Sequence, residues 1–165
     1  MSNPQINVLV LCTGNSARSI LGEALFNHLG NGRIRAFSAG SQPSGKVNPV
    51  ALETLEKHGV PLPEARSKSW DEFAAPGAPN IDLIFTVCAS AAGETCPIWP
   101  GHPTTAHWGI PDPAHIEPME ARREAFEVAY QQLKQRIDAF LKLPLETMSA
   151  DDIKSAAKKI HEATA

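Results

Sequence analysis

The sequence contains few cysteines and no long apolar run, and both absences exclude classes of protein. Its 165 residues include three cysteines, an odd number that argues against a structural disulfide framework and favours thiols kept reduced by the cell. No pair of Cys or His residues has the close spacing of a zinc finger, so we expect no metal site. No apolar run approaches a membrane span, and a net charge of −3 gives no electrostatic reason to bind nucleic acid or an anionic membrane.

The length and composition fit one principal domain. A hydrophobic content of 42% over 165 residues is sufficient for a single compact core. Residues 1–5 lead directly into the first strand pattern without the charged and apolar regions of a secretion signal, so we expect a cytoplasmic protein. We place the principal domain at residues 1–143 and a helical extension at residues 144–165, and we expect a monomer without a cofactor.

Strand patterns alternate with helix patterns along the chain. We expect strands at residues 8–12, 34–38, 81–87 and near 107–108, and helices at residues 19–30, 49–59, 69–73, 120–143 and 149–165. This alternation predicts an α/β fold, a doubly wound, four-stranded parallel sheet with helices on both faces, in which ligands bind at the carboxyl ends of the strands. The last helix would either dock a partner or pack loosely.

The stretch from Cys12 to Ser19 places a thiol and a guanidinium around a short loop between a strand and a helix. Backbone N–H groups at a helix N-terminus lack intrahelical partners and attract anions, and they also lower the pKa of a nearby thiol. Arg18 adds a fork of donors, Gly14 permits close backbone approach, and Asn15 tolerates a left-handed conformation. We therefore predict Cys12 as a nucleophile and an oxyanion-binding loop made of Thr13, Gly14, Asn15, Ser16, Ala17, Arg18 and Ser19.

Two further cysteines are candidates to meet Cys12 at the same edge of the sheet. Cys88 follows the predicted strand at residues 81–87, and Cys96 lies beyond a segment of small residues at 89–95. A thiolate that attacks the sulfur of an adduct transfers two electrons to the departing centre and leaves a disulfide, and a third thiol can then displace the first. The spacing alone leaves open whether these cysteines form such a relay or are unrelated.

Asp112 is the candidate general acid. It lies between Pro111 and Pro113, and prolines on both sides restrict the backbone, so the carboxyl group would be held in one direction. Over an oxyanion pocket, such a group can protonate a leaving oxygen. An Asp-Pro dipeptide alone is more typical of a turn, and the loop at Cys12 is the reason to favour catalysis.

These motifs together resemble a known family. The loop at residues 12–19, Cys-Thr-Gly-Asn-Ser-Ala-Arg-Ser, matches the C-x5-R-S loop of the low-molecular-weight tyrosine phosphatase fold and is similar to that of arsenate reductases built on this fold. The likeness spans residues 6–143 and continues in Phe37-Ser38-Ala39-Gly40, Val47-Asn48-Pro49, Val87-Cys88, Thr95-Cys96-Pro97, His107-Trp108-Gly109 and Asp112-Pro113.

The resemblance implies a role for each candidate residue. Cys12 would attack arsenate, Arg18 and the loop amides would hold the oxyanion, and Asp112 would act as general acid. Cys88 would resolve the arsenic adduct, and Cys96 would be its final disulfide partner. Thioredoxin is the family's usual reductant for that disulfide, and glutathione with glutaredoxin is the alternative.

The chain departs from the family beside the loop. Some relatives bind potassium there through an Asn, a Glu, a Ser and an Asp. Here Asn15, Glu23 and Ser38 match, whereas Lys68 stands at the position of the Asp. Because an ammonium group can supply the same positive charge, we expect Glu23, Ser38 and Lys68 to support the loop, and we expect no potassium dependence.

Two other functions stay open on these residues. A protein tyrosine phosphatase would use Cys12, Arg18 and Asp112 and would not need the other two cysteines. However, Ala114 and His115 stand where such phosphatases tend to carry aromatic residues, which argues against docking of a phosphotyrosine ring. A non-enzymatic sensor of oxyanions or thiols would use the same loop, with the C-terminal helix docking a partner.

Overall fold

The computed structural model describes residues 5–12, 14–30, 32–61, 67–73, 75–87, 104–110, 113–114 and 116–164. Its strands form one parallel sheet in the order β2-β1-β3-β4, made of β1 (Ile6–Leu11), β2 (Ile34–Ala39), β3 (Leu83–Thr86) and β4 (Thr104–His107). The helices are α1 (Arg18–Gly30), α2 (Pro49–Lys57), α4 (Met119–Leu141) and α5 (Ala150–Thr164), with the 3-10 helices η1 (Trp70–Phe73) and η2 (Leu145–Thr147). The prediction of a four-stranded parallel sheet is confirmed.

The strand β1 lies inside the sheet and is buried on both faces. Residues 8–11 are fully buried, as expected for a continuous apolar run between two parallel neighbours. Pairing with β2 sets Val10 opposite Ser38, and pairing with β3 sets Leu11 opposite Thr86. Because all the strands run in one direction, their carboxyl ends meet at one edge, and Cys12 follows the end of β1 there.

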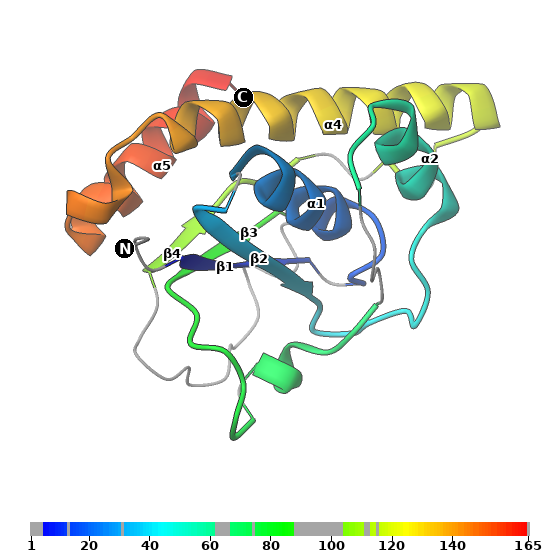
Figure 1. The fold of residues 1–165 in the computed structure, drawn as a ribbon. Coiled ribbons are helices and arrows are strands. Elements are labelled where there is room, and N and C mark those ends of the chain that lie inside the picture. The colour runs from blue at the N-terminus through cyan, green and yellow to red at the C-terminus, as the bar shows by residue number, and fades with distance from the viewer. Residues whose placement is uncertain are drawn as a thin grey trace.

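The four α-helices cover one face of the sheet, and η1 lies on the opposite face (Figure 1). Side chains alternate along β1, so Val8 and Val10 enter the larger core with the α-helices, whereas Leu9 and Leu11 pack with apolar side chains of η1. Within the described ranges, no helix is both long enough and apolar enough to cross a membrane.

The larger differences between predicted and observed boundaries have local causes. The helix α4 ends at Leu141 rather than at Leu143, because Leu143 precedes Pro144 and a residue before proline disfavours the helical conformation. The strand β3 begins at Leu83 rather than at residue 81, the point at which its pairing with Thr104 of β4 starts.

The C-terminal helix α5 packs on β4 and α4. Its Ile153 and Ala157 are buried in the larger core, and the indole N–H of Trp108 donates a 2.9 Å hydrogen bond to the carbonyl oxygen of Ala157. Trp108 is fully buried against Phe85 and Phe140, with ring centroids 4.2 Å and 5.7 Å away. The C-terminal segment therefore contributes to the same core as the sheet, and the boundary after residue 143 stays a prediction.

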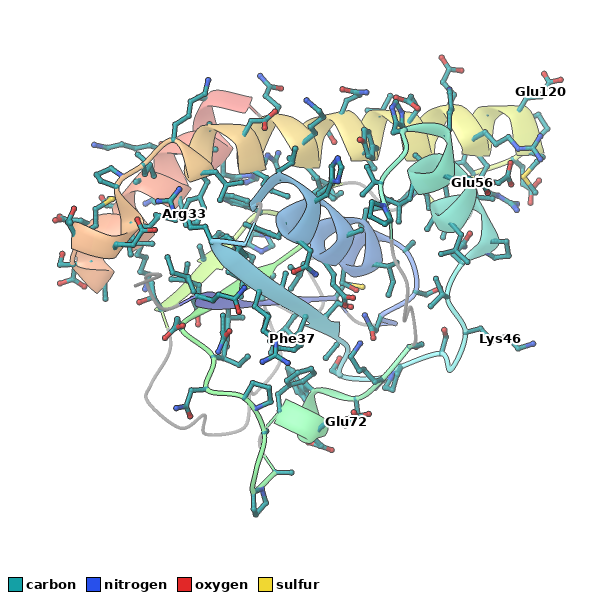
Figure 2. The ribbon with its side chains drawn as sticks, in the orientation of Figure 1. Arg33, Phe37, Lys46, Glu56, Glu72 and Glu120 are labelled. Carbon is teal, nitrogen blue, oxygen red and sulfur yellow. The ribbon has the colours of Figure 1, made fainter. Side chains whose placement is uncertain are left out.

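Arg33, in the connection before β2, fastens the end of α4 to the sheet (Figure 2). Its guanidinium contacts the two carboxylate oxygens of Glu146 at 2.5 and 2.8 Å. It also donates to the carbonyl oxygens of Leu141 and Leu143 at 2.5 and 2.6 Å. The carbonyl group of Leu141 ends α4 and lacks an intrahelical partner, so Arg33 satisfies it and also pairs with a carboxylate.

We predict that Arg33→Ala lowers the free energy of unfolding by about 1–2 kcal/mol. The two side chains are 29% and 32% exposed, so solvent screens the ion pair and the loss stays below that of a fully buried pair. Urea denaturation of wild type and variant measures the change. Lys142→Ala, which removes an exposed cation from the same region, is the matched control and should leave the midpoint unchanged.

Candidate active site

Cys12 lies directly after β1, at the entrance to the loop that leads into α1. Its side chain is buried, with 4% of the residue exposed, and its Sγ lies 3.2 Å from the Oγ of Ser19 on the first turn of α1. A hydroxyl group that donates to sulfur favours the thiolate over the thiol. Strand and helix therefore bring together the thiol and a polar partner seven residues away in sequence.

The buried side chain of Asn15 organises the loop. Its backbone has φ = 45°, a left-handed conformation that asparagine tolerates, and none of the residue is exposed. Its Nδ2 donates to the hydroxyls of Ser19 and Ser38 at 2.9 Å each, and its Oδ1 accepts from the backbone N–H of Lys68 at 2.8 Å. Because the Ser19 oxygen accepts from Asn15, its own proton is available to the sulfur of Cys12.

The carbonyl groups of the loop are held on its outer side. The carbonyl oxygen of Gly14 accepts from the N–H of Ser44 at 3.0 Å and from the Oγ of Ser67 at 3.1 Å, and the carbonyl oxygen of Ser16 accepts from the N–H of Asn48 at 2.8 Å. In a trans peptide the N–H group points opposite to the carbonyl group. The N–H groups that follow these two carbonyls therefore face the other side of the loop, where an anion would bind.

Arg18 reaches from the start of α1 to the segment that follows β4. Its Nη1 donates a 3.1 Å hydrogen bond to the carbonyl oxygen of Ile110. The segment is itself tied to the residue that follows β3, because the N–H of Ile110 donates to the carbonyl oxygen of Val87 at 3.1 Å. The guanidinium of Arg18 was predicted to bind an oxyanion. It is anchored toward the β4 edge of the sheet, whereas β2 forms the other edge.

Glu23, Ser38 and Lys68 lie together beside Asn15 of the loop. The hydroxyl of Ser38 donates to Glu23 Oε1 at 2.5 Å, and Lys68 Nζ lies 3.8 Å from the same oxygen. Burial raises the pKa of Glu23, and the hydrogen bond from Ser38 and the charge of Lys68 partly offset this effect. The ammonium group of Lys68 thus places a positive charge beside Glu23, and the backbone N–H of the same residue contacts Asn15.

Some predicted site residues lie outside the described residues, namely Thr13, Cys88, Cys96 and Asp112. The residue before Cys88 is described. Val87, the residue before Cys88, donates its N–H to the carbonyl oxygen of Leu11, the residue before Cys12, at 2.9 Å. The end of β3 therefore lies beside the start of the Cys12 loop.

No local sequence pattern marks the residues that hold the outer side of the loop. Ser44 and Ser67 are single serines in connecting segments, and the side chain of Asn48 caps α2. Their contacts with the loop link positions that are far apart in sequence, so no local sequence pattern can predict them.

A cysteine and an arginine bracket the loop between an inner parallel strand and a helix, the arrangement from which an oxyanion-binding loop was predicted. Residues 7–155 match the family of the low molecular weight phosphotyrosine protein phosphatases, and the chain belongs to this family. It is similar to the arsenate reductases of Bacillus licheniformis, with 35% identity over 141 residues, and of Bacillus subtilis, with 32% identity over 140 residues. Each alignment covers 85% of this chain and 95% of the relative.

Solved structures show the same fold. The tyrosine phosphatase Wzb from Escherichia coli K30 in complex with sulphate has a TM-score of 0.67 and 26% identity, over 84% of this chain and 98% of that chain. An arsenate reductase in the phosphate binding state has a TM-score of 0.66 and 24% identity, over the same shares of the two chains. The fold therefore serves proteins named for two different activities.

We predict that Lys68→Met raises the pKa of Glu23 further, because the variant removes a charge that lowers it. When the pKa of a carboxyl is raised in the folded state, the free energy of unfolding falls as the pH rises through that pKa. The free energy of unfolding of Lys68→Met should therefore fall more over this pH range than that of the wild type. The carbon-13 shift of the Glu23 carboxyl against pH measures the pKa. The control Lys46→Met, at an exposed position in the connection before α2 (Figure 2), should leave the pKa of Glu23 unchanged. An unchanged pKa of Glu23 in Lys68→Met would contradict the effect of the Lys68 charge on this carboxyl.

Proposed function

We propose that the protein reduces arsenate to arsenite through the thiols of Cys12, Cys88 and Cys96. The observation that carries the proposal is the buried Cys12 thiol beside the Ser19 hydroxyl, at an anion-binding loop. The presence of two further cysteines and the similarity to arsenate reductases at 32–35% identity support reduction over hydrolysis.

The first step forms a bond between sulfur and arsenic. The Cys12 thiolate attacks arsenate, and one arsenate oxygen leaves as water with a proton supplied by Asp112. Arg18 and the loop N–H groups neutralise the charge of the oxyanion. The hydroxyl of Ser19 stabilises the thiolate before attack, because its proton is directed to sulfur.

The second step transfers the electrons. The Cys88 thiolate attacks the sulfur of Cys12, and the electron pair of the sulfur–arsenic bond moves to arsenic. Arsenic is reduced from the +5 to the +3 state and leaves as arsenite, while Cys12 and Cys88 become a disulfide. Cys96 then attacks the sulfur of Cys88 and releases the Cys12 thiolate. A disulfide between Cys88 and Cys96 remains for an external dithiol to reduce.

The relay needs a supply of reduced thiols, which supports a cytoplasmic location. We propose thioredoxin as the reductant and a monomer as the active form, with glutathione and glutaredoxin as the alternative system. A solved relative described as a thioredoxin-dependent arsenate reductase of Corynebacterium glutamicum has the same fold, with a TM-score of 0.56. We assign the activity to residues 1–143 and treat residues 144–165 as a helical extension.

Hydrolysis of phosphate monoesters is the second candidate function. It is favoured by the family of the chain and by the fold shared with a sulphate-bound tyrosine phosphatase. Such an enzyme would use Cys12, Arg18 and Asp112 and would be indifferent to Cys88 and Cys96. A sensor without turnover would be recognised by its failure to process more than one equivalent of arsenate in the presence of a reductant.

We predict that Cys88→Ser abolishes arsenate turnover but spares hydrolysis of a small aryl phosphate, because a hydroxyl cannot form the disulfide that drives reduction. Arsenite production and aryl phosphate hydrolysis are measured on the same preparation. Cys12→Ser is the matched control and should abolish both reactions. Undiminished arsenate turnover in Cys88→Ser would rule out the relay.

We predict that arsenate drives NADPH oxidation when thioredoxin and its reductase are present, and drives less of it with glutathione, glutaredoxin and glutathione reductase. The two systems differ in the dithiol that attacks the final disulfide. Cys96→Ser should stop the reaction in the thioredoxin system, because the disulfide offered to the partner no longer forms. Turnover only with glutaredoxin would replace the proposed partner and leave the relay in place.

A further inference from the structure

Three consecutive carbonyl groups after β4 accept hydrogen bonds from arginine side chains. Arg136 on α4 donates through Nη1 to the carbonyl oxygen of Trp108 at 3.1 Å and to that of Gly109 at 3.4 Å. Arg18 donates to the carbonyl oxygen of Ile110 at 3.1 Å. The short segment 108–110 therefore connects a guanidinium in the core with the guanidinium of the anion-binding loop.

The position of Arg136 is unusual for a charged side chain. Only 1% of the residue is exposed, and burial lowers its pKa. A buried charge carries a large desolvation cost unless hydrogen bonds and charges offset it, and an apolar residue of similar volume would avoid that cost. Such a residue would leave the carbonyl oxygens of the segment without these donors.

The other sides of the segment are also held. The N–H groups of Trp108 and Ile110 donate to β3 and the residue that follows it, at 2.7 and 3.1 Å. The indole of Trp108 donates to α5. At Gly109, a side-chain Cβ would lie 2.7 Å from the Nε2 of His107, so the chain passes close to that ring. The sheet fixes one side of the backbone, and Arg136 fixes the carbonyl groups on another.

We infer that Arg136 is a positioning residue for the oxyanion site, which it serves by holding segment 108–110 so that Ile110 anchors the guanidinium of Arg18. The inference rests on the proposed function, because it assigns Arg18 to the oxyanion. Segment 108–110 also precedes Asp112, which lies two residues beyond Ile110 in the sequence.

Loss of Arg136 should weaken anion binding without changing the thiolate. The carbonyl groups would move to find other donors, and the anchor of Arg18 would move with them. The Cys12 thiol lies beside the hydroxyl of Ser19, which Asn15 orients, and neither of these two residues is on α4. Binding of the oxyanion and reactivity of the thiol should therefore respond separately.

The test measures how phosphate protects Cys12 from iodoacetamide in the full-length protein. Mass spectrometry of the Cys12 peptide gives the alkylation rate at each phosphate concentration, and hence a dissociation constant. We expect Arg136→Met to raise this constant roughly tenfold, the effect of misplacing one charge-assisted hydrogen bond, while the rate without phosphate stays unchanged. Arg136→Lys should recover part of the affinity, because an ammonium group can donate to one of the carbonyls.

A matched variant separates positioning from stability. Leu133→Ala removes a buried side chain one turn earlier on α4 and should lower the melting temperature without changing the phosphate constant. If Arg136→Met does not fold, the phosphate dissociation constant of Arg136→Lys tests the inference, since this variant should still bind phosphate more weakly than the wild type.

A phosphate constant equal to that of wild type in the folded variant would overturn the inference. Absence of protection in the wild type would overturn the inference and the oxyanion site together. Protection that weakens in Arg136→Met, in a protein that reduces no arsenate, would support the inference and reject the proposed function.

Discussion

The buried amide of Asn15 is the contact on which the site depends. It bonds to two buried hydroxyls and a buried backbone N–H, and it does so from a left-handed backbone position that gives the loop its shape. One amide thereby joins Ser19 on α1, Ser38 at the end of β2 and Lys68 in a distant connection. This arrangement also determines the hydrogen bond to Cys12. The Ser19 oxygen accepts from the amide of Asn15, and this directs the hydroxyl proton of Ser19 toward the sulfur.

The charges around the loop are arranged in two groups with different tasks. Glu23 and Lys68 lie together below Asn15, where burial would make either charge alone costly. Arg18 reaches in the opposite direction, to the segment after β4, and Arg136 holds the same segment from the core. The guanidinium of Arg18 is therefore placed by the packing of α4 on the sheet as well as by its own loop.

Local patterns in the sequence predicted the sheet, the helices and the residues of the loop, because strand runs, caps and the spacing of Cys12 and Arg18 are encoded within a few neighbouring positions. The left-handed conformation of Asn15 was predictable for the same reason. The contacts of Ser67 with Gly14, of Arg136 with Trp108 and of Arg33 with Glu146 were not, because each joins segments that only the completed fold brings together. An arginine inside an apolar helical stripe carries no sign in sequence of the carbonyl groups it will meet.

The hydrogen bond between Trp108 and α5 uses a main-chain carbonyl as its acceptor, and this has a consequence for how the C-terminal helix can vary. Any residue at position 157 offers the same oxygen, so side-chain identity there is constrained only by the space in the core. An insertion or deletion between η2 and Ala157 is different, because one residue rotates a helix by about 100°. Substitutions in α5 are therefore compatible with this hydrogen bond as long as the rotation of the helix about its axis, relative to the sheet, stays the same.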